Sequence, residues 1–441
     1  MQPVRDIMVQ KFGGSSVGTV ERIKHVAELV HKAKAKHPHL VVVVSAMRGE
    51  TDRLLGLAGQ MAGRPDPRET DALVATGEQV SAAMLAIALR ERGVPAVSMS
   101  GPQMLVRTDG MFSRARIKSI DRSAIDRALL RGQVVVATGF QGMDDEGNLT
   151  TLGRGGSDTS AVALAAALDA VECDIYTDVL GVYTADPNLC PDARKLDVIA
   201  FEEMMEMASA GSKVLQIRSV ELAMNHNMPV RVRSTFSDDP GTLVTGEDEH
   251  IERLVVRGVS HDNGDIKVTV RRIPDRPGVA ATLFRGLSKA GINIDVIVQN
   301  ASEDGKTDVS FTVAKADAAQ AEELVREAAR ELQGGNVEVD HAISKVSIVG
   351  VGMRAHAGVA AEMFQALHEA GVNIAMITTS EIKVTCVIAR AQVEKAVKAL
   401  HARFELQAGG KKAKPPARAK KAAKPKAKAK SKSAARRGKK R

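Results

Sequence analysis

The fold is first indicated by the stretch Ile7-Met8-Val9-Gln10-Lys11-Phe12-Gly13-Gly14-Ser15-Ser16, near the start of a chain of 441 residues. Its apolar first half predicts a strand, and its glycines predict a turn that opens a helix. That helix should run to about Lys36, because apolar residues then recur near helical spacing. Residues 40–44 follow as a β-branched run, which is typical of a strand buried on both faces of a sheet.

Strands and helices alternate beyond this point. The pattern predicts strands at residues 96–99, 133–138, 173–177 and 229–234, and helices at residues 52–62, 69–92, 201–210 and 213–226. Two more helices are expected, one ending near Leu130 and one made of small residues and ending near Ala170. Short apolar strands separated by helices favour a mainly parallel α/β sheet that is covered on both faces.

The second part of the chain contains an internal repeat. Lys267-Val268-Thr269-Val270 matches Lys345-Val346-Ser347-Ile348, and Ala290-Gly291-Ile292-Asn293-Ile294 matches Ala370-Gly371-Val372-Asn373-Ile374. The offset is 78 residues at the first of these matches and 80 at the second. Each unit has the pattern strand, helix, strand, strand, helix, which predicts the ferredoxin-like order βαββαβ. We therefore expect a tandem duplication of a small domain.

Composition excludes several classes of protein. The chain is 44% apolar, enough for about two to four domains, but only 2% aromatic, which disfavours aromatic platforms for single-stranded nucleic acid. Its three cysteines form no C-x-x-C pair, which excludes a disulfide framework and a zinc finger and favours a reducing cytosol. The apolar runs are too short for a membrane helix, and the first residues have no apolar signal region. We therefore expect a cytoplasmic protein without membrane contact.

Charge is distributed unevenly along the chain. The net charge is +9, yet residues 409–441 carry 16 Lys and Arg and no Asp or Glu, so the rest of the chain has a net charge of −7. Residues 408–441 are rich in Lys, Ala and Pro and are predicted to be a disordered tail. Such a polycation favours non-specific contact with nucleic acid, whereas the acidic body has no DNA-reading motif.

Two glycine-rich segments carry candidate chemistry. In Gly153-Arg154-Gly155-Gly156-Ser157-Asp158, amides can cradle an anion, and Arg154 offers a planar fork to a carboxylate. In residues 11–16, glycines permit close approach of a ligand, and Lys11 can place a cation on transferring oxygens. The alternatives are an ordinary capped loop and an ordinary strand–turn–helix. Weaker signals are Glu78, the segment 176–187, and Lys213, which we expect at the start of a helix.

Several competing sites are absent from the sequence. It has no G-x-x-x-x-G-K-[ST] phosphate loop, no H-R-D or D-F-G set, and no G-x-G-x-x-G at the first strand. Its 11 histidines show no H-E-x-x-H or other metal-ligand spacing, so we expect no metal site built from protein side chains.

Together these segments resemble the aspartokinase family within the amino-acid kinase superfamily. The resemblance rests on residues 11–16, Val44-Ser45-Ala46-Met47, Thr76-Gly77-Glu78, residues 153–160 and 181–187, and Gly211-Ser212-Lys213-Val214-Leu215, and it covers residues 4–406. The repeats resemble the paired ACT domains of the lysine- and threonine-sensitive bacterial type. This implies a three-layer amino-acid kinase domain at 1–248, ACT domains at 262–341 and 342–407, and the tail at 408–441.

The resemblance also implies an activity. ATP, accompanied by Mg²⁺, would phosphorylate the side chain of L-aspartate to 4-phospho-L-aspartate, the first step toward lysine, methionine and threonine. Lys11 and Asp158 would be catalytic, and Glu78 and Arg154 would hold the α-ammonium and α-carboxylate groups. The other implied substrate-binding residues are Thr51, Gly155, Gly156 and Ser157. The implied nucleotide-binding residues are Lys11, Phe12, Gly13, Gly14, Ser45, Thr177, Asp178, Tyr183, Thr184, Ala185, Asp186, Pro187 and Lys213.

Feedback inhibition by lysine, threonine or both is implied as well, in a homo-oligomer or an α/β assembly formed through the ACT domains. The implied effector-binding residues are Asp275, Arg276, Pro277, Gly278, Val279, Ala280, Asn293, Ile294, Asp295, Gln299, Asn373, Ile374, Ser380 and Glu381. Three features depart from the family pattern: Leu180, Ala357-Gly358 in place of Pro-Gly, and the basic tail. Two other functions stay open, an amino-acid sensor with an inactive kinase half and a nucleic-acid-associated protein; Lys11, Arg154 and Asp158 argue against the sensor.

Overall fold

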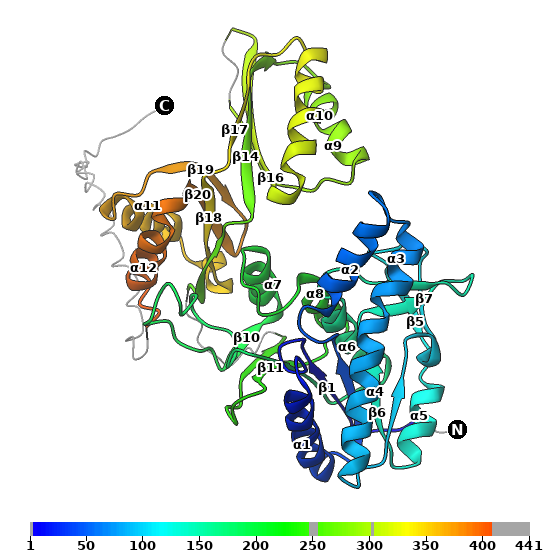
Figure 1. Cartoon of the computed structure of the whole chain (residues 1–441). Coiled ribbons are helices and arrows are strands. Elements are labelled where there is room, and N and C mark those ends of the chain that lie inside the picture. Colours follow the sequence, from blue (N-terminus) through cyan, green and yellow to red (C-terminus); the bar gives the residue numbers. More distant parts are fainter. Residues whose placement is uncertain (1–2, 247–254, 301–303, 408–441) are drawn as a thin grey trace, which may run out of the picture.

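The computed structural model describes residues 3–246, 255–300 and 304–407, and its largest sheet has eight strands (Figure 1). All neighbouring strands in it are parallel except one antiparallel pair, Val230–Ser234 with Thr242–Thr245, so the expected mainly parallel sheet is confirmed. Across the sheet the strands are β10 (Val198–Ala200), β12 (Thr242–Thr245), β11 (Val230–Ser234), β9 (Glu172–Thr177), β1 (Ile7–Phe12), β2 (His39–Val44), β6 (Val134–Thr138) and β3 (Ala96–Met99).

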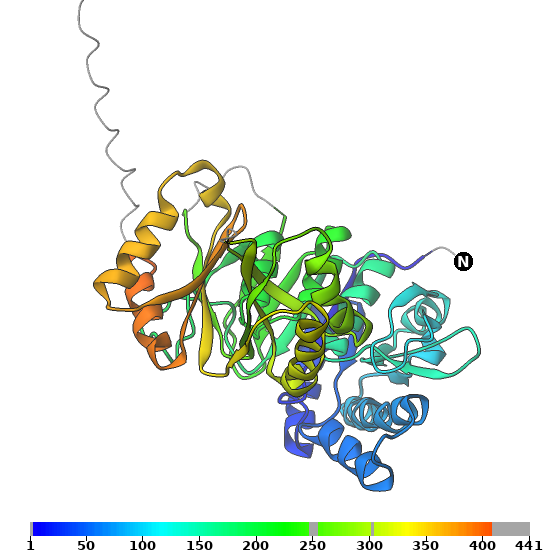
Figure 2. The same ribbon diagram turned by 90° about the horizontal axis from the view of Figure 1, so that it is seen from above.

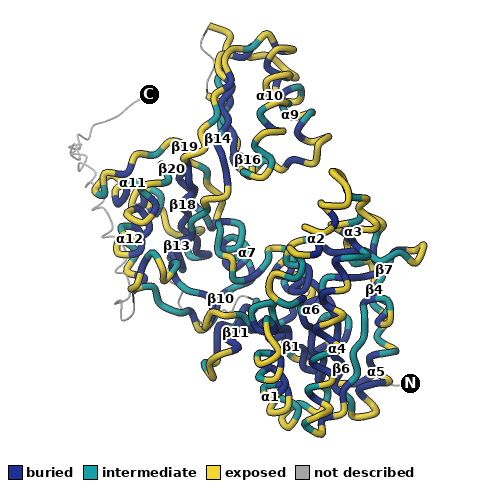
Figure 3. Tube along the Cα trace, in the orientation of Figure 1, coloured by how far each residue is buried: buried dark blue, intermediate teal, exposed yellow. Residues whose placement is uncertain are grey.

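Helices cover both faces of this sheet and make a three-layer domain. One face packs against α1 (Val20–Lys36) and α4 (Thr76–Glu91). The other face packs against α5 (Ser123–Leu130), α6 (Gly156–Ala167), α7 (Phe201–Ser209) and α8 (Ile217–Asn225). Residues 40–44 are fully buried between the two layers, as their β-branched run predicts, and the central strands form the dark core of Figure 3.

Three local expectations are wrong, and one small sheet was missed. Helix α1 begins only at Val20, behind a Thr19 cap, so the glycine turn at Gly13 is not itself a helix N-terminus. The helix expected at 69–92 is two helices, α3 (Pro67–Val74) and α4. Lys213 does not begin a helix, because α8 starts four residues later. A second, small sheet was not foreseen; it contains β5 (Ile117–Ile120), β4 (Val106–Thr108), β7 (Gln141–Met143) and β8 (Leu149–Thr151).

Helix α2 (Glu50–Met61) completes this domain beside α3. Residues 67–91, which include α3 and α4, form the helical stretch of the described chain that is long and apolar enough to cross a membrane. Half of its most apolar window is buried inside the fold, as in the core helix of a globular domain.

The repeat forms two ferredoxin-like units, but one strand of the second unit comes from a segment that precedes the first unit in the sequence. The first unit has the expected order, with β14 (Asp265–Pro274), α9 (Val279–Lys289), β15 (Ile294–Gln299), β16 (Lys306–Ala314), α10 (Ala318–Glu331) and β17 (Val337–Asp340). The second has β18 (Ile343–Val349), α11 (Val359–Glu369), β19 (Ile374–Thr379), β20 (Lys383–Ala389) and α12 (Val393–Arg403). Its fourth strand is β13 (Gly258–Asp262), which precedes the first unit and pairs with β18.

The second unit lies beside the larger domain (Figure 2) and contacts it at α7. Glu203 on α7 accepts hydrogen bonds from Arg257 at 3.3 Å and from the amide of Val351 at 3.1 Å. Glu206, on the same helix, pairs with Lys383 of β20 at 2.7 Å. The side chain of Val349 packs into the hydrophobic core below α7. Helix α7 therefore joins the repeat units to the sheet that carries the candidate site.

Candidate active site

Lys11 and Asp158 form an ion pair at the carboxyl end of the central strands. Lys11 lies in β1 and Asp158 in the first turn of α6, and Lys11 Nζ is 2.5 Å from Asp158 Oδ1. Both side chains are about nine-tenths buried, at 10% and 11% exposure. A buried cation so close to a carboxylate is held in one position, which suits a group that must meet charge developing on a substrate.

The glycine turn after β1 leaves room beside this ion pair. A Cβ atom on Gly13 would lie 3.3 Å from Lys11 Nζ, and the amide of Gly13 donates to the carbonyl of Tyr176 at 3.3 Å. Tyr176 in turn stacks on Phe12, with ring centroids 4.5 Å apart. A side chain at position 13 would therefore crowd the ammonium group that the site presents.

The second glycine segment connects β8 to α6. Gly153 and Gly155 have φ angles of 77° and 71°, in the left-handed region that favours glycine. A Cβ atom on Gly155 would lie 1.8 Å from Gln216 Cγ, so the loop packs tightly against the turn that precedes α8. The side chain of Arg154 is exposed, and that of Asp158 is buried at the start of α6. The loop thus exposes Arg154 to solvent and leads into the buried Asp158.

Glu78 is a buried acid in the first turn of α4. It is 3% exposed, and its Oε2 atom has no hydrogen-bond partner. Burial raises its pKa to about 7, against the opposing effects of a hydrogen bond from the Ala46 amide and of the Lys11 charge. A buried carboxylate with a free oxygen suits a cationic ligand group. Thr51, the second residue of α2, is partly exposed.

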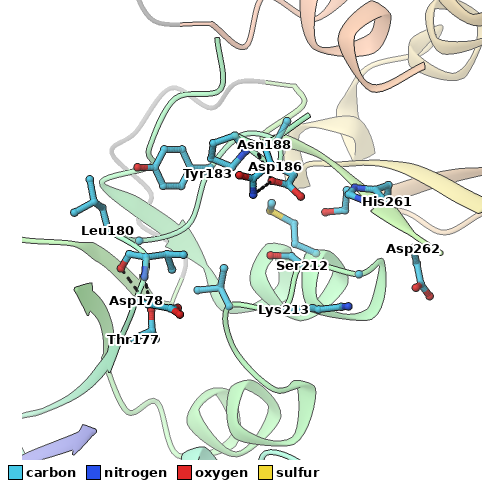
Figure 4. Close-up of a pocket in the computed structure, with 18 of the residues that line it drawn as sticks. Thr177, Asp178, Leu180, Tyr183, Asp186, Asn188, Ser212, Lys213, His261 and Asp262 are labelled. Carbon is cyan, nitrogen blue, oxygen red and sulfur yellow. Dashed lines mark hydrogen bonds between the residues drawn. The ribbon is translucent and has the colours of Figure 1, made fainter. Parts of the chain in front are cut away.

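A cavity of about 1030 Å³ opens beside Lys11 and Asp158 (Figure 4). Thr177, Asp178 and Leu180 lie on one side of it, Tyr183 and Asp186 lie across the top, and Lys213 projects from the turn before α8. Nine of the residues predicted to bind nucleotide line it: Lys11, Gly13, Thr177, Asp178, Tyr183, Ala185, Asp186, Pro187 and Lys213.

The cavity lining does not include the other four. Phe12 is fully buried under Tyr176, and Gly14 packs so closely on Ala46 that an added Cβ would meet its carbonyl oxygen at 3.0 Å. The hydroxyl of Thr184 is buried and hydrogen-bonded to His401 Nε2 at 2.9 Å. Ser45 follows β2 and donates its amide to the carbonyl of Phe12 at 3.1 Å. Along strands and extended loops, alternate side chains face away from the cavity.

The structure adds wall residues that the sequence analysis missed. Residues 259–264, from β13 and the turn after it, line the cavity although they precede the repeat units. Burial lowers the pKa of His261, while Asp186 and Asp262 act in the opposite direction. No motif marks these residues, since their position follows from pairing of β13 with a strand about 90 residues later. Within the described ranges, no group of three or more His, Cys, Asp or Glu side chains is placed to hold a metal ion.

The predicted effector residues do not form one site within the chain. Ile294 pairs with Val313, at the end of the first repeat sheet where β14 begins. Gln299 pairs with Val309, near the opposite end, where residues 275–280 follow β14. Asn293, Ile294 and Asp295 are thus separated from Asp275, Arg276, Pro277, Gly278, Val279, Ala280 and Gln299 by the length of the strands. In the second unit, Asn373 and Ile374 are likewise at the other end of β19 from Ser380 and Glu381.

Asp295 instead takes part in a cluster of charges between the repeat units. Lys345 Nζ is 2.5 Å from Asp295 Oδ2, 2.7 Å from Asp265 Oδ2 and 3.3 Å from Asp262 Oδ2. Burial lowers the pKa of Lys345, but its hydrogen bonds to the carboxylates outweigh burial and raise the pKa above its usual range. A second cavity of about 160 Å³, beside the end of α7, is lined by Asp295, Lys345, Ser380 and Lys383, among others.

Comparison with known proteins agrees with this architecture. The amino acid kinase family matches residues 6–234, and the ACT domain matches residues 266–328 and 346–404. The aspartokinase of Pseudomonas aeruginosa is 54% identical over 404 residues, which cover 91% of this chain and 98% of that protein. The aspartokinase of Mycolicibacterium smegmatis is 48% identical over 405 residues, or 91% of this chain and 96% of that protein.

Solved structures agree as well. Escherichia coli aspartokinase III in complex with aspartate and ADP is similar with a TM-score of 0.74 and 29% identity, over 90% of this chain and 99% of that one. The same enzyme in complex with lysine and aspartate has a TM-score of 0.72 and 28% identity, over 91% of this chain and all of that one. The order of domains, the spacing of the glycine segments and the identity over nearly the whole chain lead to one conclusion: this protein belongs to the aspartokinase family of the amino acid kinases.

Proposed function

We propose that the protein transfers the γ-phosphoryl group of ATP to the side-chain carboxylate of L-aspartate, giving 4-phospho-L-aspartate and ADP. The observation that carries this proposal is the Lys11–Asp158 ion pair in the wall of the large cavity. A bond forms between a carboxylate oxygen and the γ-phosphorus, while the bond from that phosphorus to the bridging oxygen of ADP breaks. Lys11 stabilises the negative charge on these oxygens, and Asp158 keeps Lys11 in place.

No general base is required in this reaction. The aspartate side chain has an ordinary pKa of about 3.9 and is already ionised at neutral pH. The chain therefore needs to position two anions and to offset their repulsion, which is the work of cations and backbone amides rather than of a proton acceptor. This explains why the buried carboxylate of Asp158 faces Lys11 at 2.5 Å instead of standing free.

Glu78 and Arg154 are proposed to bind the ends of the substrate that do not react. Glu78, buried and with one unpartnered oxygen, suits the α-ammonium group. Arg154, exposed on the glycine loop, suits the α-carboxylate. Thr51 and the amides of Gly155, Gly156 and Ser157 are assigned to the same substrate.

We assign the nucleotide to the large cavity, with Tyr183, Asp186 and Lys213 among its contacts. Mg²⁺ would bind mainly to the phosphates of ATP, where it neutralises charge, because the described residues offer no cluster of three metal-ligating side chains. The E. coli enzyme is known with ADP and with aspartate, which supports both substrate assignments.

Regulation by amino acids is part of the same proposal. The two ACT units, and the lysine complex of the E. coli enzyme, support feedback inhibition by lysine, threonine or both. The effector residues of one chain are split between the two ends of each repeat sheet, so an effector site is proposed to form between units in a homo-oligomer or an α/β assembly. The protein is proposed to work in the cytoplasm, with residues 1–248, 262–341 and 342–407 as its domains and β13 completing the last of these.

An assay of ATP-dependent aspartyl hydroxamate formation tests this function. We expect hydroxamate only when both ATP and L-aspartate are present, and inhibition when lysine and threonine are titrated singly and together. A folded protein that binds lysine or threonine but forms no hydroxamate would be a sensor instead of a kinase.

The basic tail lies outside the described residues, and its proposed partner is nucleic acid bound without sequence preference. A chain ending at Gln407 should keep its kinase activity, whereas only the intact chain should shift DNA, with an affinity that falls steeply as salt rises. Equal DNA binding by both chains would remove the tail from this role.

A further inference from the structure

Asp71 is a buried carboxylate that the proposed chemistry does not use. It lies on α3, is 1% exposed, and accepts hydrogen bonds from four donor groups. The amide and hydroxyl of Ser113 donate to it at 2.9 and 3.2 Å, and the amide and hydroxyl of Thr151 donate at 2.7 and 2.8 Å. A buried charge is costly unless it is fully hydrogen-bonded, so these donors fix the two segments firmly on α3.

Arg218 on α8 holds the same two segments from another side. Its guanidinium donates to the carbonyl of Leu152 at 2.8 Å and to the carbonyl of Ala115 at 3.2 Å. The segments are also joined directly, because the amide of Ala115 donates to the carbonyl of Thr151 at 2.8 Å. An anion thus binds the donor groups of residues 113 and 151, and a cation binds the acceptor groups of residues 115 and 152.

The segments held in this way lead straight into the glycine loop. Gly153 follows Leu152 directly, and a Cβ atom on Gly153 would lie 2.9 Å from the carbonyl oxygen of Ser113. On the other side, α3 joins α4 at Ala75, whose carbonyl accepts a hydrogen bond from Gln141 at 2.9 Å. Glu78 comes three residues later, in the first turn of α4. Asp71 therefore links the helix pair that carries Glu78 to the loop that carries Arg154.

We propose that Asp71 and Arg218 are positioning residues that set the separation between the two ends of the aspartate site. The inference rests on the proposed function, in which Glu78 binds the α-ammonium group and Arg154 the α-carboxylate. Asp71 fixes the loop relative to α4, and Arg218 fixes it relative to α8 and the turn that bears Lys213. Neither residue touches the substrate; each acts through the backbone of residues 113–115 and 151–152.

The first test compares Asp71→Asn with Asp144→Asn in the full-length protein. Asp144 is a matched control, because it is also a buried carboxylate that accepts backbone hydrogen bonds, from Glu146 at 3.0 Å and Asn148 at 2.8 Å. It lies in the turn between β7 and β8, at the end of the hairpin away from the glycine loop. In Asp71→Asn, an amide group faces hydrogen-bond donors, so the loop loses one of its anchors.

We expect Asp71→Asn to raise KM for aspartate at least 10-fold while KM for ATP changes less than 2-fold, and Asp144→Asn to leave both constants within 2-fold. Melting temperatures are measured for both variants, since a merely structural carboxylate would lower stability and leave KM for aspartate unchanged. Equal effects of Asp71→Asn on both KM values, or an equal effect of Asp144→Asn on KM for aspartate, would overturn the proposal.

Milder variants keep the test decisive if Asp71→Asn does not fold. Ser113→Ala removes one hydroxyl but keeps both amides, and Arg218→Lys replaces a fork that binds two carbonyls with a single ammonium group. Each should raise KM for aspartate about 2- to 5-fold, with KM for ATP unchanged. Wild-type hydroxamate formation tests the aspartate kinase function separately; an active wild type whose variants all keep normal KM for aspartate would refute the positioning role alone.

Discussion

At the scale of single residues, the site separates two tasks that charged side chains perform. Lys11 and Asp158 form an ion pair, and Glu78 is buried with one oxygen that has no hydrogen-bond partner in the described chain. A cation held beside a carboxylate is pre-organised for charge that develops during transfer, and a buried carboxylate with a free oxygen can accept a cationic ligand group. Substitution of the Lys11–Asp158 pair should therefore lower kcat, whereas substitution of Glu78 should raise KM for aspartate.

Removal of Lys11 should affect turnover more than binding. Lys11→Ala is expected to lower kcat at least about 100-fold, because a cation held at the transferring oxygens is lost. Asp158→Asn should have a similar effect, since Lys11 then loses the carboxylate that orients it. Lys24→Ala, on the exposed face of α1, is the control and should leave kcat unchanged. Steady-state kinetics of a folded Lys11→Ala protein with normal kcat would contradict the assignment.

Replacement of Glu78 should weaken aspartate binding and stabilise the fold. The folded-state pKa of about 7 lies above the ordinary value of 4.5, so the folded protein binds this proton more tightly than the unfolded chain does. The resulting stability is fully present below about pH 4.5 and is lost as pH rises through 7. Glu78→Gln should therefore be more stable than wild type above pH 7, by on the order of 3 kcal/mol, with little difference near pH 4.

The same residue gives a kinetic test. KM for aspartate should rise in the wild type as pH falls from 8 to 6, because a protonated Glu78 no longer attracts the ammonium group. In Glu78→Gln it should be high and independent of pH, and KM for ATP should be nearly normal in both. Denaturant titrations and initial rates at several pH values measure both effects; parallel rises in KM for aspartate and ATP would make Glu78 a structural residue.

At the scale of elements, the long periodic segments were predictable and the short paired ones were not. Strands β2 and β6 carry continuous apolar runs, and β1 and β9 combine apolar residues with bounding turns, so the sequence locates these four strands within one or two residues. Strands β4, β7 and β8 have three residues each and no pattern that distinguishes them from loops. Lys11 and Asp158 could be foreseen because glycine segments mark them, while Asp71 and His261 gain their roles only from pairing across the fold.

Strand β13 should be needed for the stability of the two ACT units as an isolated fragment. A fragment of residues 255–407 contains β13, whereas a fragment of residues 264–407 leaves the edge of β18 unpaired and uncovers the core around Val259, which is 2% exposed in the chain. Loss of this apolar burial costs about 2–3 kcal/mol, and a free edge invites aggregation. We expect the shorter fragment to melt at a lower temperature and to aggregate, as judged by circular dichroism and light scattering; equal melting curves would contradict the borrowed strand.

At the scale of the whole molecule, one buried lysine connects the two ACT units to the wall of the large cavity beside Lys11 and Asp158. Lys345 pairs with Asp262, which lies in the cavity wall, and with Asp295, which lies on the edge strand of the first ACT unit. Lys345 also lines the smaller cavity beside α7. Because these ion pairs are direct, a shift of the first ACT unit would change the position of Lys345 and, through Asp262, that of residues 259–264 in the cavity wall.

This arrangement predicts how feedback inhibition is lost. An effector inhibits only if it favours one arrangement of the units over another, and such coupling is typically worth about 1–3 kcal/mol. Asp295→Asn removes one of the two carboxylates of the first ACT unit that pair with Lys345, and leaves Asp265 on β14 and Asp262 to pair with it. The lysine or threonine concentration for half-inhibition should rise about 5- to 100-fold, while turnover without effector stays nearly normal.

Asp308→Asn, which breaks a pair with Arg271 near the other end of the sheet, is the control and should be inhibited like the wild type. If Asp295→Asn is inhibited as strongly as the control, the pair between Asp295 and Lys345 does not transmit the signal.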